Sequence, residues 1–152
     1  MPTLVRRALL ADSDEIAEVF LASRATMTYL PRLHTDDDTR SFIAHVVRDL
    51  ETFVAVRAER IVGFAALRED WLDHLYVLPE RFNTQTGTKL FEEVRFQRPQ
   101  GVQFWVFQQN AGARRFYERH GCALARLTDG SRNEERLPDA LYVWPATRAP
   151  SE

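Results

Sequence analysis

The segment from Asn110 to Gly121 places several chemically useful groups on one side of a predicted helix. Asn110 is a residue type that caps helix N-termini, and Gly121 is the type that most often follows a helix C-terminus. Spacings of three and four residues bring one set of side chains onto a common helical face. This set is Asn110, Ala113, Phe116, Tyr117 and His120. The small Ala113 permits close approach of an elongated ligand, and the Tyr117 hydroxyl at the sheet edge is a candidate proton donor.

A predicted strand over 71–77 carries a second candidate group, the carboxylate of Asp73. Side chains alternate between the faces of a strand, so Asp73 and His74 point to opposite faces. The neighbours of Asp73 on its own face are Trp71, Leu75 and Val77. Burial among these residues would raise the pKa of Asp73 towards the range of a general base. Capping of a nearby turn is the alternative role for Asp73, and His74 is predicted to be a hydrogen-bonded core residue.

A third candidate is an anion site at the start of a helix predicted to run through Leu90, Phe91 and Val94. Helix N-termini present unpaired N–H groups and the positive end of the helix dipole. The N–H groups over 83–88 and the nearby threonine hydroxyls can surround a phosphate. A Walker-type loop is excluded, because Lys89 does not directly follow Gly87 and no glycine lies at the required distance upstream.

The elements that position these groups follow the pattern of a mixed α/β sheet covered by helices. Strands are expected over 3–9, 52–57, 61–67, 71–77, 102–107, 122–127 and 140–144, and the apolar strand 102–107 is predicted to be buried on both faces. A first helix is expected from Asp12, with Glu15 completing a capping box, to about Tyr29. A second helix is expected to start at Thr35, ahead of three aspartates that suit the dipole.

The length, net charge and cysteine content of the chain limit the classes of protein to which it can belong. The 152 residues suit one domain, expected over 1–146, with a disordered tail over 147–152. A net charge of −2 offers no electrostatic basis for nucleic-acid binding, and no apolar run approaches the length of a membrane span. Cys122 is the only cysteine and the four histidines have no metal-ligand spacing, so neither a disulfide nor a metal site is expected. A cytoplasmic location is predicted.

Nearly the whole chain resembles the GCN5-related N-acetyltransferase (GNAT) family. The resemblance rests on the stretches 72–80, 86–91 and 110–121. In the third stretch the family pattern of an Asn, a small residue, a Phe-Tyr pair and a Gly is met by Asn110, Ala113, Phe116, Tyr117 and Gly121. The resemblance implies a GNAT fold, with a central mixed sheet of six to seven strands splayed between the fourth and fifth and about four flanking helices.

The same resemblance implies direct acetyl transfer from acetyl-coenzyme A to an amine of a small-molecule or peptide acceptor. Tyr117 would protonate the leaving sulfur and Asp73 would take the amine proton, directly or through water. Cys122 follows a helix-ending glycine and is not expected to be a nucleophile. The implied cofactor-binding residues are Leu75, Tyr76, Val77, Asn83, Thr84, Gln85, Thr86, Gly87, Thr88, Asn110, Ala113, Phe116 and Tyr117.

Acceptor-site candidates are Tyr29, His34, Glu51, Trp71 and Asp73. For His34 and Glu51 the alternative is a solvated surface residue. Acidic neighbours of Asp73 in sequence, Glu51 and Asp70, predict an acceptor mouth that prefers a cationic amine. The charged loop around Asn133-Glu134-Glu135 is interpreted as solvated, with the rim of the acceptor site as the alternative.

One departure from the family pattern concerns the pyrophosphate loop. Phe82 stands where the family has Gln or Arg, and Gln85 stands where it has a glycine that lets backbone approach phosphate. These changes predict weak cofactor binding. They favour the alternatives of a non-catalytic acyl-coenzyme A-binding module, or a partner-binding protein that uses only the scaffold. No nucleic-acid or membrane partner is expected, and a homodimer is implied because many relatives are dimers.

Overall fold

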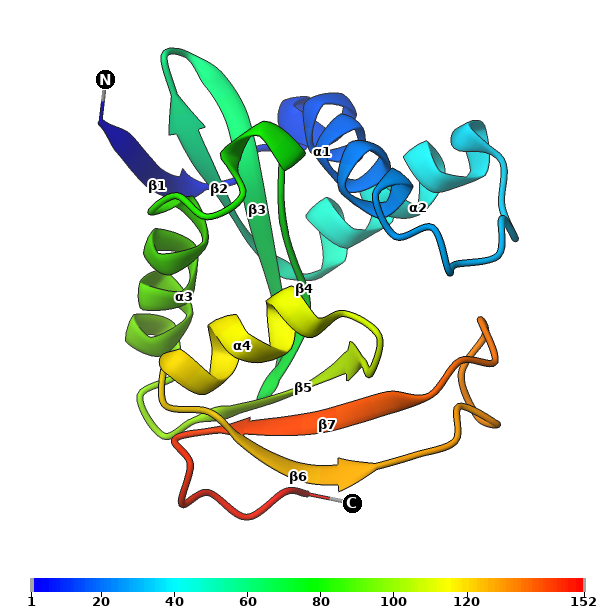
Figure 1. Ribbon diagram of the computed structural model, residues 1–152. Helices are drawn as coiled ribbons and strands as arrows, with labels where there is room; N and C mark the ends of the chain where they lie inside the picture. The colour runs from blue at the N-terminus through cyan, green and yellow to red at the C-terminus, as the bar shows by residue number, and fades with distance from the viewer. Residues whose placement is uncertain (1, 152) are drawn as a thin grey trace.

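The computed structural model describes residues 2–151 and contains a 7-stranded mixed sheet in the order β1-β2-β3-β4-β5-β7-β6 (Figure 1). The strands are β1 Thr3–Arg7, β2 Glu51–Arg57, β3 Arg60–Arg68, β4 Trp71–Val77, β5 Val102–Phe107, β6 Ala123–Leu127 and β7 Asp139–Trp144. The helices are α1 Ser13–Ala25, α2 Asp36–Asp49, α3 Thr86–Gln97 and α4 Ala111–Arg119, with 3-10 turns η1 Leu10–Asp12 and η2 Pro79–Arg81. The expected fold class is confirmed.

The sheet divides between β4 and β5, which run parallel and pair only at Trp71 and Gln103 within the described chain. A further bond from Gln103 N to the Asp70 carbonyl, 2.9 Å long, holds the strands together at this end. Beyond it the strands diverge, so that β1 to β4 form one half of the sheet and β5, β7 and β6 the other (Figure 1). The predicted splay between the fourth and fifth strands is therefore confirmed.

Helices cover both faces of the first half of the sheet. On one face, Phe20 of α1 packs edge-on against Tyr76 of β4, with ring centroids 5.0 Å apart. On the opposite face, α3 lies so close to β3 that a Cβ added at Gly63 would stand 2.9 Å from Leu90 Cδ1. The alternation of side chains along β4 thus separates an α1 face from an α3 face.

The start and end of α1 differ from the sequence-based expectation. Asp12 does not cap the helix, because its carboxylate accepts hydrogen bonds from Arg6 and from the Leu9 N–H at 2.7 Å. Glu15 bonds the Ile61 N–H of β3 at 2.8 Å, so the expected capping box does not form. The helix ends at Ala25, ahead of Tyr29, which leaves 26–35 as a connecting segment. The cap of α2 is as predicted, with Thr35 Oγ1 accepting from the Asp38 N–H.

Two further expectations are corrected by packing in the second half of the sheet. Trp105 of β5 is 43% exposed, so this strand is not buried along both faces. Residues in the tail, expected to be disordered from 147, contact the end of the sheet where the strands meet. Arg148 pairs with Asp70 at 2.5 Å, and the Ser151 N–H donates to Gln103. Residue 152 lies outside the described part of the chain.

Across residues 2–151, none of the helices combines the length and the apolar character that crossing a bilayer requires.

Candidate active site

A cavity of about 1350 Å³ opens where β4 and β5 diverge. Its walls come from both strands, from the loop before α3, from α4, and from the segments that follow α1 and β6. The segments after α1 and β6 face each other at one end of the splay (Figure 1). The volume exceeds that of a typical small-ligand pocket, roughly 300–1,000 Å³. The cavity therefore suits an extended ligand together with a second molecule.

Tyr117 forms part of the α4 wall and is buried. Asn110 caps α4 by accepting from the Ala113 N–H at 3.1 Å, as predicted, and this fixes the helix above β5. The Tyr117 ring packs 4.3 Å from the Phe104 ring of β5 and 5.7 Å from the Phe91 ring of α3. Burial raises the pKa of Tyr117 well above its usual range. The hydroxyl therefore keeps its proton and is able to act as a donor.

Asp73 lines the same cavity, but its surroundings differ from the prediction. Its two carboxylate oxygens accept hydrogen bonds from Arg68 at 2.8 and 3.2 Å. The Arg68 guanidinium also lies over the Trp71 ring, 6.0 Å from its centroid. The carboxylate is thus held by a bidentate ion pair and is not enclosed by apolar neighbours alone.

Among the residues of β4, His74 has the surroundings that differ most from the prediction. It lines the cavity on the α1 face, and its Nδ1 is buried without a hydrogen-bond partner, so the expectation of a satisfied core histidine is wrong. Burial lowers the pKa of His74 to about 4, against a smaller opposing effect of Asp73 and with a further lowering by Arg24. The imidazole is therefore neutral at physiological pH, and its Nδ1 is enclosed without a partner.

The opposite end of the cavity is bordered by the segments that follow α1 and β6, and a pair between α1 and the second segment holds it. Glu135 lines the cavity and pairs with Arg24 at 3.0 Å, and both side chains are mostly buried. Tyr29 also lines this end, and its hydroxyl is buried without a partner. Burial raises the pKa of Tyr29. The loop at Glu135 therefore belongs to the rim of the site, and the interpretation of a solvated loop is corrected.

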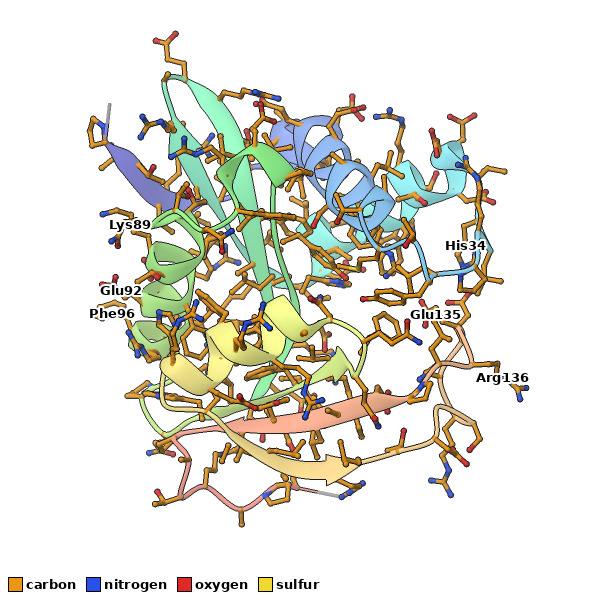
Figure 2. All side chains as sticks on the ribbon, in the orientation of Figure 1. His34, Lys89, Glu92, Phe96, Glu135 and Arg136 are labelled. Atoms are coloured by element: carbon orange, nitrogen blue, oxygen red, sulfur yellow. The ribbon has the colours of Figure 1, made fainter. Side chains whose placement is uncertain are left out.

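Three acceptor-site candidates lie outside the cavity wall in the described chain. His34 is exposed and contacts Glu134. Figure 2 labels His34 and the neighbouring rim residue Glu135, which lie on the same side of the molecule. Glu51 pairs with Arg98 at 3.0 Å. Trp71 sits at the closed end of the splay, where β4 pairs with β5.

Glu51 and Asp70, from which a cationic acceptor was predicted, also lie outside the cavity wall of the described chain. Glu51 and Asp70 are both neutralised by arginine, and neither lines the cavity within residues 2–151. The Arg98 and Arg148 partners hold the pKa of Glu51 and of Asp70, respectively, below the usual range. These two residues therefore do not make the cavity mouth negative, and the prediction of a cationic acceptor from them is wrong.

The loop before α3 offers fewer free hydroxyls than the sequence suggested. Thr84 donates to the Arg81 carbonyl at 2.6 Å, and Thr88 contacts His120 Nε2 at 3.1 Å. Thr86 is fully buried and lies outside the cavity wall, as does the exposed Gln85. The remaining predicted cofactor contacts do line the cavity: Leu75, Tyr76, Val77, Asn83, Thr84, Gly87, Thr88, Asn110, Ala113, Phe116 and Tyr117.

Cys122 lies behind Tyr117 and outside the cavity wall of the described chain. Its thiol is buried, and burial raises the pKa of Cys122 to about 12. A protonated, enclosed thiol is a poor nucleophile. This geometry supports the sequence-based expectation that acyl transfer does not pass through cysteine.

The residues that sequence reasoning missed are Arg24, Arg81 and Glu135. Each occurs in a segment read as helix surface or loop, where charged side chains are usually solvated. Arg81 directly precedes Phe82, the residue that stands where the family pattern has Gln or Arg. For the loop that carries Glu135, the sequence predicts solvation and gives the rim of the acceptor site only as the alternative. Only the tertiary packing brings Arg81 and Glu135 to the cavity wall and places Arg24 against Glu135.

Comparisons with known proteins relate the chain to acetyltransferases. The model of the acetyltransferase (GNAT) domain matches residues 48–121. A mycothiol acetyltransferase from Corynebacterium jeikeium (strain K411) is 33% identical over 98 residues, which are 63% of this chain and 26% of that protein. The chain thus spans about a quarter of the length of this curated relative.

Solved structures with a similar fold cover almost the whole chain. YjaB from Escherichia coli has a TM-score of 0.77 at 20% identity, covering 95% of this chain and 98% of YjaB. YncA from Salmonella typhimurium, solved with its cofactor acetyl-CoA, has a TM-score of 0.72 at 15% identity, covering 100% of this chain and 98% of YncA. At these identities the similarity concerns the fold.

Proposed function

We propose that the chain acts as a GNAT acetyltransferase and transfers the acetyl group of acetyl-coenzyme A to an amine. The observation that carries this proposal is the position of Tyr117, a buried and protonated phenol in the wall of a cavity between splayed strands. A proton donor is needed there because the departing group of a thioester is a thiolate. A binding module without chemistry has no such requirement.

The cofactor is proposed to lie between the strands with its pantetheine arm along β4. Past Trp71, the edge of β4 that faces β5 has no strand partner within the described chain. Its backbone N–H and C=O groups around Leu75 to Val77 are therefore available to an extended ligand that pairs as an added strand would. Acetyl-coenzyme A supplies an acetyl group activated as a thioester.

The protein groups then act on two sides of the bound thioester. A backbone N–H near Leu75 stabilises the oxyanion that develops as the amine nitrogen bonds to the carbonyl carbon. The carbon–sulfur bond breaks, and Tyr117 gives a proton to the leaving sulfur. Asp73, held by Arg68, is the proposed acceptor of the amine proton, directly or through water. His74, with its free Nδ1 on the opposite face, is the second candidate.

The acceptor is proposed to enter from the end of the cavity lined by Tyr29 and Glu135. This end lies beyond the acetyl position when the pantetheine arm follows β4 from the loop before α3. The carboxylate of Glu135 is matched by Arg24, so this ion pair favours neither a cationic nor an anionic acceptor. Small molecules and peptide amines are both compatible with this charge balance.

Two properties of the whole protein complete the proposal. The single thiol of Cys122 suits a reducing cytoplasm. A homodimer is the assembly that the family resemblance implies.

The test of this function is amine-dependent release of coenzyme A. Purified protein is incubated with acetyl-coenzyme A and a panel of polyamines, amino acids, arylalkylamines and short peptides, and the released thiol is measured. We expect binding of acetyl-coenzyme A by calorimetry and thiol release with at least one amine. Binding without release on every amine would favour the non-catalytic module, and no binding would exclude both functions.

Asp73→Asn tests the identity of the base with the best amine from that panel. If Asp73 accepts the amine proton, kcat/KM of the parent rises with pH through an ionisation that the variant lacks, and the rate falls about 10²-fold. Glu69→Gln, a nearby exposed acid outside the cavity wall, is the control and should retain the parental profile. Profiles that coincide for parent and Asp73→Asn would transfer the role to His74 or to water.

A further inference from the structure

Trp105 presents a large aromatic surface to the cavity from the middle of β5. It lines the cavity wall and is 43% exposed, whereas the neighbouring Phe104 and Val106 are buried. The Phe104 ring packs against Tyr117 of α4, and side chains alternate along a strand, so the indole lies on the face of β5 turned away from α4. The core of the protein leaves part of this ring uncovered, and a ligand in the cavity is able to pack against it.

This indole lies beside the part of the gap where the chemistry is proposed to occur. The parallel strands β4 and β5 pair at Trp71 and Gln103, and Asp73 and Trp105 each stand two residues beyond that pair, on either side of the gap. Asp73 is the proposed acceptor of the amine proton, and it lines the same cavity. An amine held next to Asp73 therefore has the rest of its molecule within reach of the indole.

Further apolar side chains continue from Trp105 towards the mouth of the cavity. Phe107 follows two residues later, on the same face by strand alternation, and lines the cavity. Its ring lies 6.1 Å from the ring of Tyr29, in the segment after α1, and Met27 of that segment also lines the cavity. The acceptor side of the cavity thus has an aromatic and apolar wall, which suits an acceptor with an apolar body.

The four carboxylates of the described cavity wall all accept hydrogen bonds from protein groups. They are Asp73, held by Arg68; Glu135, held by Arg24; Asp139, held by Thr128 and Asn133; and Asp129, held by the Ser131 N–H. A second ammonium group on the acceptor would have to compete with these partners. The wall therefore offers a polyamine no carboxylate that lacks a partner.

Arg126 adds a positive charge on the same face of the sheet as Trp105. Both residues flank Leu141 of β7, because Trp105 pairs with it from β5 and Arg126 pairs with it from β6. Directly paired residues project to the same face, and neighbouring strands lie about 4.8 Å apart, so roughly 10 Å separates the two backbones. Arg126 lines the cavity, as does Arg132 in the loop after β6. A second cationic group on the acceptor would meet these arginines, which disfavours its binding.

We propose that the acceptor is a primary amine on an aromatic or extended apolar body with no second cationic group, and that Trp105 determines this preference. The inference rests on the proposed function for the reaction and adds the class of acceptor. In this arrangement the amine lies next to Asp73 and the body packs on the indole. Arg126, beyond the indole, disfavours polyamines.

The experiment measures release of coenzyme A from acetyl-coenzyme A with three matched amines. para-Methylbenzylamine has an aromatic body, para-xylylenediamine replaces its methyl group with an aminomethyl group, and methylamine has no body. The variants are Trp105→Ala, Trp105→Phe and Arg126→Gln. Melting temperatures verify that each variant is folded, and the calorimetric Kd of acetyl-coenzyme A verifies that its cofactor site is intact.

Two control variants remove the same kinds of side chain away from the cavity, and Figure 2 labels both positions. Phe96→Ala removes an aromatic ring that is 78% exposed, beside a separate depression formed by β1 and α3. Arg136→Gln removes a charge from the loop after β6, at an exposed residue outside the cavity wall.

We expect the parent to acetylate para-methylbenzylamine with a kcat/KM about 10-fold above the values for the other two amines. Trp105→Ala should raise the KM of para-methylbenzylamine about 10-fold, as for the loss of one aromatic contact, while kcat and the Kd of acetyl-coenzyme A stay within about threefold. Trp105→Phe should retain most of the preference, because it keeps a ring. Arg126→Gln should reduce the discrimination against para-xylylenediamine about threefold, and both controls should match the parent.

Several results would overturn the inference. A parent that prefers para-xylylenediamine or methylamine would exclude the acceptor class, and an unchanged KM in Trp105→Ala would remove Trp105 from the acceptor site. An equal loss in Phe96→Ala, or with methylamine as the acceptor, would reduce the effect to general damage. Unchanged discrimination in Arg126→Gln would remove the role of Arg126. If Trp105→Ala does not fold, Trp105→Leu, which is apolar and lacks the ring, decides the question.

Failure of the proposed function gives a different result. A parent that releases no coenzyme A with any amine of the wider panel would exclude acetyl transfer itself. Release with other amines, but none with para-methylbenzylamine, would exclude only the acceptor class and leave the proposed function in place.

Discussion

Replacing Tyr117 by phenylalanine is expected to lower kcat about 10²-fold while the Kd of acetyl-coenzyme A stays within about twofold. The substitution keeps the ring that packs against Phe104 and Phe91 and removes only the hydroxyl. Without the donor, the thiolate must leave unprotonated in a site that penalises buried anions. Steady-state kinetics with the best amine and calorimetry with acetyl-coenzyme A measure the two quantities.

The raised pKa of Tyr117 is compatible with this role. The burial that disfavours tyrosinate also disfavours a thiolate, as the pKa of about 12 for Cys122 illustrates. A developing thiolate in the cavity is therefore more basic than one in water, which favours proton transfer from the phenol.

A matched control is available in the same half of the sheet. Tyr142 is fully buried, and its hydroxyl donates to Glu118 at 2.7 Å and accepts from Arg114 at 3.0 Å, outside the cavity wall of the described chain. Tyr142→Phe should lower the free energy of unfolding by about 1 kcal/mol and leave kcat unchanged. Equal kcat for Tyr117→Phe and the parent would assign Tyr117 to packing.

The second large effect concerns His74 and the stability of the protein in acid. The folded chain holds the pKa of His74 at about 4, below the value of 6.5 of a free histidine. Between these values the unfolded chain binds a proton that the folded chain does not, so stability is complete above pH 6.5 and is lost as the pH falls. The contribution amounts to about 3 kcal/mol by pH 4.

His74→Phe is expected to remove this part of the pH dependence. Phenylalanine retains an aromatic ring beside Phe20 and Tyr76, takes no proton, and eliminates the unpaired Nδ1. Urea unfolding between pH 4 and pH 7 should show a smaller loss of stability in the variant than in the parent. The carboxylates that also titrate in this range act on both proteins, so the difference between them isolates His74.

The control for this experiment is His45→Gln, at an exposed position on α2. It should leave the slope of stability against pH unchanged. The charged groups that shift His74 are Arg24 on α1 and Asp73 on β4, and both remain in place in each variant. A slope in His74→Phe equal to that of the parent would show that the imidazole titrates as it does in the unfolded chain.

The order of the elements and much of the cavity wall were predictable from the sequence. Period-2 and helical patterns, the Thr35 and Asn110 caps and the glycine after α4 are local features, and local features are determined by a few neighbouring residues. The splay and the placement of Tyr117 followed from the family pattern in 110–121. These predictions agree with the sheet order and with the one paired position, Trp71 and Gln103, that β4 and β5 share within the described residues.

The partners of the charged side chains were decided only by the tertiary structure. Asp73 forms an ion pair with Arg68 across a turn, and Glu135 forms one with Arg24, which is distant in the sequence. Glu51 pairs with Arg98, outside the cavity wall of the described chain. Long side chains reach several neighbours, and which of them is within reach depends on how loops and helices pack. Local sequence therefore determined which helices and strands carry the candidate groups. Packing of these elements determined the ion pairs around the cavity and brought His74 and Arg81 to its wall.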